Sequence, residues 1–165
     1  MDENSLMKLT LTRADRSFTD WVTLLSLIQS SYAYMEGQVD PPSSLHSYDT
    51  KTLKTKSREE ILWLAYADRD LVGSIFGKVN GKSLYVGKLA IDPEHQGKGI
   101  GGQLMKALET EALERNLEEL ELEVRIELTG NQKAFAAMGF HVSKSSIHEG
   151  YDKVTFLEMR KKLNP

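Results

Sequence analysis

The sequence contains no cysteine and no long apolar run. Without cysteine the chain can form no disulfide, no cysteine nucleophile and no cysteine-based zinc site. No apolar run approaches the roughly 18 residues that span a bilayer. Lys and Arg form no dense strip and the formal net charge is −3, which argues against a nucleic-acid surface. We therefore expect no metal site and no nucleic-acid or membrane partner.

The composition is otherwise ordinary for one soluble domain. The chain has 165 residues, of which 40% are hydrophobic and 27% are charged. The N-terminal stretch MDENSLMKLT is acidic and polar, unlike a signal peptide. We expect a single domain over residues 1–165 and a cytoplasmic location. A mildly acidic protein should attract a cationic small substrate sooner than a polyanion.

Glycine is concentrated in one stretch, between a strand-like run that ends at Ile91 and a helix-like pattern. Asp92 and Pro93 break the run, and four glycines then fall within residues 97–102. Such a loop exposes backbone N–H groups, and a helix start adds unpaired N–H groups and the positive end of a dipole. The stretch predicts an anion site suited to a phosphate or pyrophosphate, and a glycine-rich loop without a ligand is the alternative.

Hydrophobic periodicity predicts a mixed α/β protein. A capping box at Ser17 and Asp20 is possible before the first helix, and Ser43 or Ser44 could cap a short helix that ends at Lys54. The predicted strands are 7–13, 60–67, 71–79, 84–91, 118–126, 140–147 and 153–160, and the longer helices are 18–31, 99–116 and 131–138. A strand–helix–strand crossover is right-handed, so strands 84–91 and 118–126 should be parallel.

The alternation of strand 84–91 slips by one residue across Gly87 and Lys88. Leu84 and Val86 share one phase, whereas the apolar residues that follow share the other. A β-bulge would produce this slip and would free backbone groups for a ligand. Burial of both faces of the strand is the alternative.

Two known phosphate loops fit the glycines poorly. A P-loop whose tail is Gly81-Lys82-Ser83 would need its first glycine where the chain has Phe76. The dinucleotide pattern G-x-G-x-x-G is satisfied by Gly97, Gly99 and Gly102. However, residues 92–96 separate the strand from the glycines, where the dinucleotide fold makes a direct turn.

The third possibility is a coenzyme A pyrophosphate loop, and here the sequence resembles the GNAT family of N-acetyltransferases. Residues 96–101, QGKGIG, match the family motif R/Q-x-x-G-x-G/A at the start of a helix. Residues 89–93 look like the family's strand end, and Gly139-Phe140 looks like its closing Gly-Phe. The resemblance covers about residues 7–160. It implies a single-domain, mostly antiparallel sheet with a central parallel, splayed strand pair and flanking helices.

The resemblance implies acetyl-CoA as the cofactor. Backbone groups of Leu89, Ala90 and Ile91 would pair with the pantetheine arm, and the thioester would lie between the splayed strands. Asn131 would contact the coenzyme, or it is a helix cap. The pyrophosphate would be held by the backbone of Gln96, Gly97, Lys98, Gly99, Ile100, Gly101 and Gly102. Phe135, also beside the coenzyme, stands where many members have a proton-donating tyrosine.

Acetyl transfer to an amine requires loss of a proton from the ammonium group, a polarised carbonyl and a stabilised leaving thiolate. The candidate catalytic residues are Glu127, Glu123, His148 and Tyr151, with Tyr85 as a further candidate acid. Glu127 should lie nearest the splay, although alternating glutamates on a strand can also form a solvated face. The candidate substrate residues are Tyr32, Tyr34, Glu36 and His46.

These observations predict an acetyl-CoA-dependent N-acetyltransferase. Direct attack by a primary amine in a ternary complex is expected, because no cysteine is present to carry an acyl group. The acceptor would be a small molecule or a peptide, and the last strands could mediate a homodimer. Phe135 keeps open the alternative of a non-catalytic CoA-binding or ligand-sensing protein of the same fold.

Overall fold

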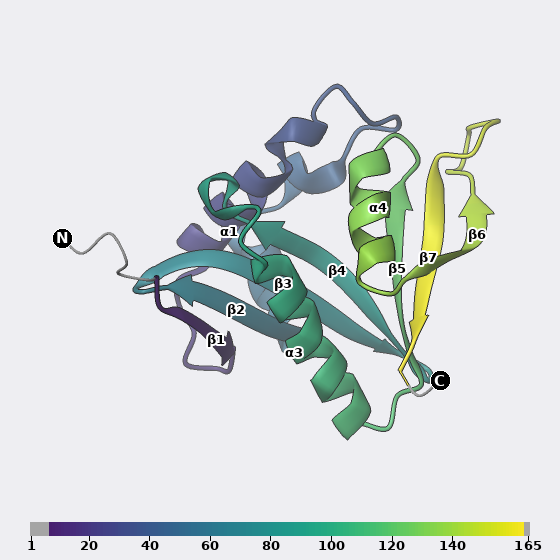
Figure 1. The fold of residues 1–165 in the computed structure, drawn as a ribbon. Coiled ribbons are helices and arrows are strands. Elements are labelled where there is room, and N and C mark those ends of the chain that lie inside the picture. The colour runs from purple at the N-terminus through teal and green to yellow at the C-terminus, as the bar shows by residue number, and fades with distance from the viewer. Residues whose placement is uncertain (1–6, 164–165) are drawn as a thin grey trace.

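The computed structural model describes residues 7–163, except for the side chain of His46 (Figure 1). Seven strands form one sheet in the order β1-β2-β3-β4-β5-β7-β6. Neighbouring strands are antiparallel apart from β4 and β5, which run parallel. The strands are β1 (Leu9–Arg13), β2 (Ile61–Ala67), β3 (Asp70–Asn80), β4 (Ser83–Ile91), β5 (Glu119–Arg125), β6 (His141–Ser146) and β7 (Phe156–Lys162). The predicted mixed, mostly antiparallel sheet is confirmed.

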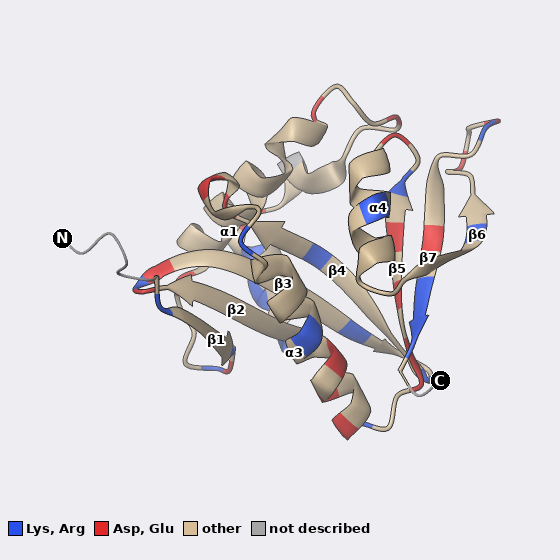
Figure 2. Ribbon diagram, viewed as in Figure 1, with Lys and Arg blue, Asp and Glu red and all other residues tan. Residues whose placement is uncertain are grey.

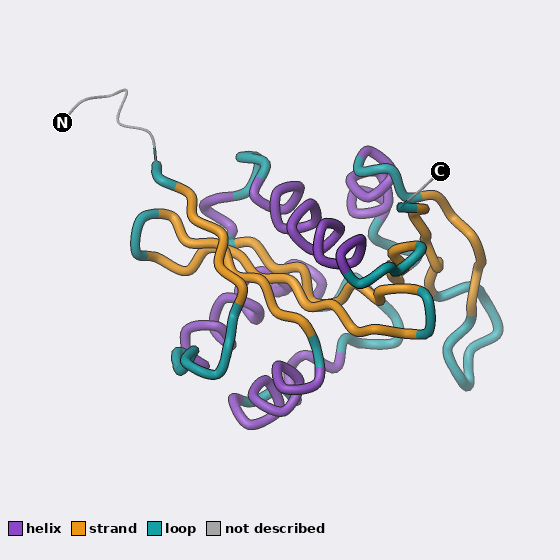
Figure 3. Tube along the Cα trace, turned by 90° about the horizontal axis from the view of Figure 1, so that it is seen from below, coloured by secondary structure: helices purple, strands orange, loops and turns teal. Residues whose placement is uncertain are grey.

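Helices cover both faces of this sheet. The pair α3 and α4 lies on one face, and the pair α1 and α2 lies on the other (Figure 1 and Figure 3). The helices are α1 (Trp21–Tyr32), α2 (Thr50–Glu59), α3 (Ile100–Glu114) and α4 (Thr129–Ala137), with 3-10 turns η1 (Ala33–Met35), η2 (Ser44–Ser47) and η3 (Pro93–His95). No helix within residues 7–163 is long and apolar enough to cross a membrane.

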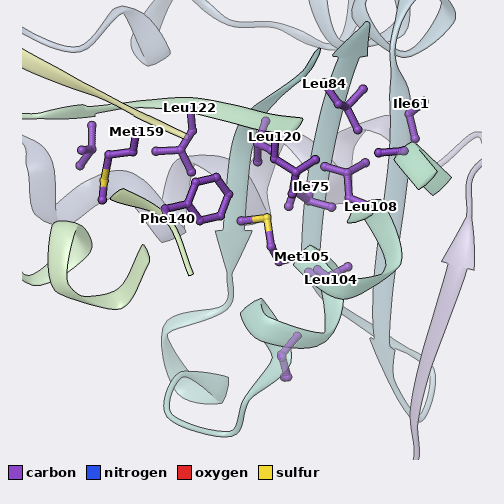
Figure 4. Close-up of a cluster of buried hydrophobic side chains, with 14 of the residues drawn as sticks. Ile61, Ile75, Leu84, Leu104, Met105, Leu108, Leu120, Leu122, Phe140 and Met159 are labelled. Carbon is purple, nitrogen blue, oxygen red and sulfur yellow. The ribbon is translucent and has the colours of Figure 1, made fainter. Parts of the chain in front are cut away.

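The core consists of two layers of side chains, one on each face of the sheet. Ile75 and Phe76 are neighbours in β3, and both are completely buried, but they belong to different layers. Successive side chains of a strand point to opposite faces, which explains why β2, which is covered on both faces, is apolar along its whole length. Figure 4 shows the first layer, where Ile75 lies among Leu104 and Leu108 of α3 and Leu120 of β5.

The segment between α1 and β2 differs from the prediction. Instead of one short helix ending at Lys54, the chain forms η2 and then α2. Ser43 caps η2, as its hydroxyl accepts the N–H of Leu45. α2 begins after Asp49, whose carboxylate accepts the N–H of Thr52 at 2.8 Å. The helix was missed because it buries little apolar surface, so its sequence has no helical stripe.

The capping box predicted before α1 does not form. The hydroxyl of Ser17 donates to the carboxylate of Asp15, and the helix begins three residues later than expected, at Trp21. Asp20 occupies the N-cap position without a side-chain hydrogen bond to the helix. The side chain of Ser17 therefore bonds within a local turn and does not cap the helix.

β4 and β5 pair only over their first three residues. The parallel partners are Ser83 with Glu119, Leu84 with Leu120 and Tyr85 with Glu121. Beyond these pairs the strands diverge, as Figure 1 shows. The predicted splay of the parallel pair is confirmed, and the site described next lies along it.

Candidate active site

The glycine-rich loop joins β4 to α3 with its backbone open to solvent. After η3, Gly97 and Gly99 adopt left-handed φ values of 77° and 79°. Gly99 is the N-cap of α3 and has no side chain to bond the first N–H groups of the helix. These N–H groups have no partner within the helix itself. The loop therefore gathers backbone donors at the positive end of a helix dipole.

The space beside this loop is open. A Cβ atom added to Gly97, Gly99 or Gly102 would meet no described heavy atom within 4 Å. A ligand can therefore approach the main chain as closely as bare backbone allows. These residues fit a pyrophosphate, whose oxygens accept hydrogen bonds from helix-start N–H groups. The exposed Lys98 adds a positive charge beside them.

β4 contains the bulge that its alternation predicted. Lys88 and Leu89 together oppose the single β3 residue Ile75, whereas pairing is regular on either side. Lys88 has a φ of 48°, which is uncommon for a residue other than glycine. A bulge bends its strand and leaves one residue out of the ladder. The one-residue slip is thus a bulge, and it lies where β4 has already left β5.

Two side chains of α1 hold the open edge of β4 just after the bulge. The hydroxyl of Tyr32 donates to the carbonyl of Leu89 at 2.6 Å. The N–H of Ile91 donates to the hydroxyl of Ser31 at 3.0 Å. A pantetheine arm along this edge must use the groups that these side chains leave free, or must replace them.

Ala90, between those two residues, faces β3 instead. Its partner in the ladder is Ser74. Two residues on, the N–H of Asp92 donates to the carbonyl of Val72 at 2.8 Å. Hydrogen-bonded pairs alternate along an antiparallel ladder, so the backbone groups of Ala90 also point into β3. Of the three residues expected to pair with pantetheine, only Leu89 and Ile91 present backbone groups to the gap between β4 and β5.

A cavity of about 370 Å³ lies where β4 and β5 diverge. Its walls come from both strands, from α1, from segment 43–56, from α4 and from two residues of the β6–β7 hairpin. Small-molecule sites in proteins usually have volumes of about 300–1,000 Å³. The cavity is therefore large enough for a small acceptor and the end of a coenzyme.

Glu123 and Tyr85 form one polar wall of this cavity. The Tyr85 hydroxyl lies against the Glu123 carboxylate on the neighbouring strand. Partial burial and the nearby carboxylate of Glu158 raise the pKa of Glu123. Burial and the Glu123 carboxylate raise the pKa of Tyr85, which therefore stays protonated. A carboxylate with a raised pKa is a better proton acceptor than an ordinary one.

Three cationic side chains reach the same cavity, namely Lys56 of α2, Lys88 of the bulge and Arg125 of β5. Figure 2 shows basic segments on β4 and at the end of β5, on either side of the gap. Lys56 pairs with Glu60 at 2.8 Å. Burial and the two neighbouring cations lower the pKa of Lys88. The wall is thus basic, although the net charge of the chain had suggested a cationic substrate.

Glu127 and Tyr151 lie outside this cavity, and both contact Asp40. The carboxylate of Glu127 accepts the N–H of Asp40 at 3.2 Å, and the hydroxyl of Tyr151 donates to the Asp40 carboxylate at 2.7 Å. This last bond raises the pKa of Tyr151. Glu127 was expected to be the better placed catalytic glutamate. In the structure Glu123 lines the cavity, whereas Glu127 hydrogen-bonds to the loop that contains Asp40.

α4 contributes an aromatic ring and an amide to the cavity. Phe135 lines it and packs edge-on against Phe140, with ring centroids 6.0 Å apart. Asn131 also lines it, and its amide donates to the hydroxyl of Tyr34 at 2.9 Å. Asn131 lies within the helix, whose N-cap is Leu128, so the alternative of a cap is excluded. Tyr34 itself is 43% exposed.

The remaining candidates are scattered. His148 lines the cavity from the loop before β7, where its ring hydrogen-bonds to the hydroxyl of Thr155 and packs on Phe156 with centroids 4.8 Å apart. Glu36 is exposed and borders a second hollow beyond α1. The backbone of His46 lies in η2, but its side chain is outside the described part of the chain.

The basic residues of the cavity were not predicted as site residues. Lys88 had a usable signal, because the slip in alternation marked its position as a bulge. Lys56 and Arg125 had none, since they lie far apart in the sequence and meet only through the fold. The tyrosine beneath Lys88, Tyr48, was missed for the same reason.

A family model agrees with this geometry. The model, described as the acetyltransferase (GNAT) family, matches residues 21–140, which is most of the chain. No curated protein matches the sequence significantly.

Several solved acetyltransferases share the fold. The ribosomal-protein-S18-alanine N-acetyltransferase from Escherichia coli has a TM-score of 0.76 and 16% identity, with 96% of each chain covered. The PaiA N-acetyltransferase from Thermoplasma acidophilum, solved with coenzyme A, has a TM-score of 0.76 and 21% identity, covering 94% of this chain and 99% of that one. A GNAT family acetyltransferase from Elizabethkingia anophelis, solved with acetyl-CoA, has a TM-score of 0.67 and 15% identity over 93% and 97%. At such identities the likeness establishes the fold alone.

Proposed function

Since the chain belongs to the acetyltransferase (GNAT) family, we propose that it is an acetyl-CoA-dependent N-acetyltransferase that acts on a primary amine. The observation that carries this proposal is the course of β4. The strand borders the cavity, bulges at Lys88 and leads into the glycine loop. One strand thus connects an anion site with a cavity for the reacting groups.

The chain's own residues fit the coenzyme. The backbone of residues 96–102 would hold the pyrophosphate, and the open edge of β4 at Leu89 and Ile91 would hold the pantetheine arm. When bound, acetyl-CoA supplies a thioester whose acetyl group can pass to a nucleophile. Two of the solved structures with this fold contain coenzyme A or acetyl-CoA, which supports the same assignment here.

Glu123 is the residue best placed to act as the general base. An amine acceptor enters mostly as an ammonium ion and must lose a proton before its nitrogen can attack. The Glu123 carboxylate lines the cavity and has a raised pKa, so it can take that proton. Tyr85 stays neutral beside it and can hold the carboxylate in position by a hydrogen bond.

Phe135 supplies no proton to the leaving group. A thiol has an ordinary pKa of about 8.5, so its thiolate can leave near neutral pH without a dedicated acid. The ring of Phe135 instead forms part of the cavity wall, where it packs against Phe140. Direct attack by the amine in a ternary complex is consistent with these residues.

The test is release of the coenzyme thiol over a panel of amines, with mass spectrometry of the products. We expect turnover with at least one primary amine, and stabilisation against heat by acetyl-CoA that grows with its concentration. Stabilisation without turnover on any amine would favour the non-catalytic CoA-binding protein, which Phe135 makes the natural second candidate. The absence of both would refute the proposal.

A further inference from the structure

We propose that the acceptor amine also carries a carboxylate, which the basic wall of the cavity binds through Lys88. The inference rests on the proposed function and names the substrate class of the same site. It places the two charges of a zwitterion on two walls. The ammonium faces Glu123 on β5, and the carboxylate faces Lys88 on β4.

Lys88 is a cation without a counter-ion in the described part of the chain. Its side chain lines the cavity and is only partly exposed. No carboxylate among residues 7–163 forms an ion pair with it. Its Nζ lies 5.0 Å from the centre of the Tyr48 ring, a cation–π contact that offsets only part of the cost of lost hydration. A bound anion would supply the missing partner.

The neighbouring cations reinforce this preference. Lys56 is neutralised by Glu60, but the Nη1 of Arg125 donates at 2.6 Å to a neutral acceptor, the carbonyl of Pro41. Arg125 and Lys88 thus both bring positive charge to the cavity without a carboxylate partner among the described residues. Glu123 offers one negative charge against them. A substrate with an amine alone leaves Lys88 without an anion, whereas a zwitterion matches both walls.

The bulge gives Lys88 this position. In a regular strand, side chains alternate between the two faces of the sheet. The left-handed φ of Lys88 and the extra residue in β4 change that alternation just where β5 has separated. The bulge that interrupts the β3–β4 ladder beside the coenzyme site therefore also places Lys88 beside the acceptor.

The experiment compares L-amino acids with their carboxamides, which keep the amine and the side chain but lose the negative charge. Rates are measured at saturating acetyl-CoA for the wild type, Lys88→Met and the control Lys78→Met. Lys78 is exposed on β3, outside the cavity. We expect the wild type to prefer acids in kcat/KM by about 10- to 100-fold, the range of a hydrogen bond to a charged group. Lys88→Met should lose most of this preference, measured as the ratio of kcat/KM for each acid to kcat/KM for its carboxamide within that variant, and Lys78→Met should keep the preference.

Equal kcat/KM for acids and carboxamides in the wild type would overturn the inference while leaving the acetyltransferase intact. A preference that survives in Lys88→Met, or weaker acetyl-CoA binding as the only defect of that variant, would also overturn it. If no amine is acetylated, the proposed function fails separately, and melting temperatures with CoA plus each compound decide the inference. The inference is supported if the acids, but not the carboxamides, raise the melting temperature of the wild type and this rise is lost in Lys88→Met. Equal rises for acids and carboxamides refute it.

Discussion

The glycine loop and the cavity are built in opposite ways. The loop is one contiguous segment, residues 96–102, and it offers backbone N–H groups. The cavity is formed by side chains that range along the chain from Tyr32 to Phe156, and they meet only because β4 and β5 part after Tyr85. The coenzyme half therefore depends on local main-chain geometry, whereas the acceptor half depends on side chains that the fold brings together from distant parts of the chain.

The largest effect is expected from a substitution that blocks the glycine loop. Gly99→Val places a side chain where a phosphate must meet backbone, and it strains a φ of 79°. We expect thermal stabilisation by acetyl-CoA to disappear. The matched control is Gly81→Val in the β3–β4 hairpin, which also has a left-handed φ and open space around it. The control should lose comparable stability but keep acetyl-CoA binding. Unchanged binding in Gly99→Val would show that the loop is not the coenzyme site.

The next largest effect is expected from a substitution in the cavity that does not change the glycine loop. Glu123→Gln should lower kcat by about 100- to 10,000-fold, the usual contribution of a general base, without changing acetyl-CoA binding. In the wild type, activity should rise with pH as the Glu123 carboxyl ionises, and its raised pKa moves this rise above the range of an ordinary glutamate. Glu127→Gln is the control and should act within a few-fold of the wild type. A larger loss in the control would restore Glu127 as the better candidate.

A smaller effect tests the place where the two halves join. Tyr32→Phe removes the hydrogen bond to the Leu89 carbonyl beside the bulge. The free energy of unfolding should fall by about 0.5–1.5 kcal/mol, the net contribution of one hydrogen bond at this partly buried position. Denaturant unfolding measures the loss, and kcat should fall several-fold as the bulge loosens. Tyr66→Phe, at a half-buried tyrosine of β2 whose hydroxyl makes no hydrogen bond within residues 7–163, should change neither quantity.

The smallest effect on activity is expected on the α3 side of the sheet, away from both halves. Burial alone would raise the pKa of Glu111, but hydrogen bonds from Arg13, Trp63 and Arg115 lower it overall. A carboxyl with a lowered folded-state pKa stabilises the fold above its unfolded pKa and loses that contribution as pH falls through the folded value. Glu111→Gln should therefore lower the melting temperature at neutral pH, with a gap that narrows below about pH 4 and unchanged kcat. A gap that widens on acidification would contradict this assignment.

The sequence predicted the parts of the site that follow from local chemistry. The glycines and the helix start marked the anion loop, and the slip across Gly87 and Lys88 marked the bulge. Strict alternation from Leu120 to Val124 identified β5, and the crossover rule then made β4 and β5 parallel. Each of these signals lies within a few residues of the feature that it predicts.

The parts that escaped prediction depend on tertiary contacts. α2 buries only Leu53, so its pattern resembled a loop. The basic cavity wall combines Lys56 and Arg125, and no local pattern connects positions so far apart. Glu127 was preferred over Glu123 because it was expected to lie nearest the splay of β4 and β5. The Glu127 carboxylate instead accepts a hydrogen bond from the Asp40 N–H, and no sequence pattern indicates this tertiary contact.

A crystal structure of the protein with coenzyme A tests the account most directly. We predict that the pyrophosphate lies on the N–H groups of residues 97–102 and that the sulfur lies in the cavity between the bulge of β4 and Glu123. A pyrophosphate bound away from that loop, or a sulfur outside the cavity, would contradict the proposed site.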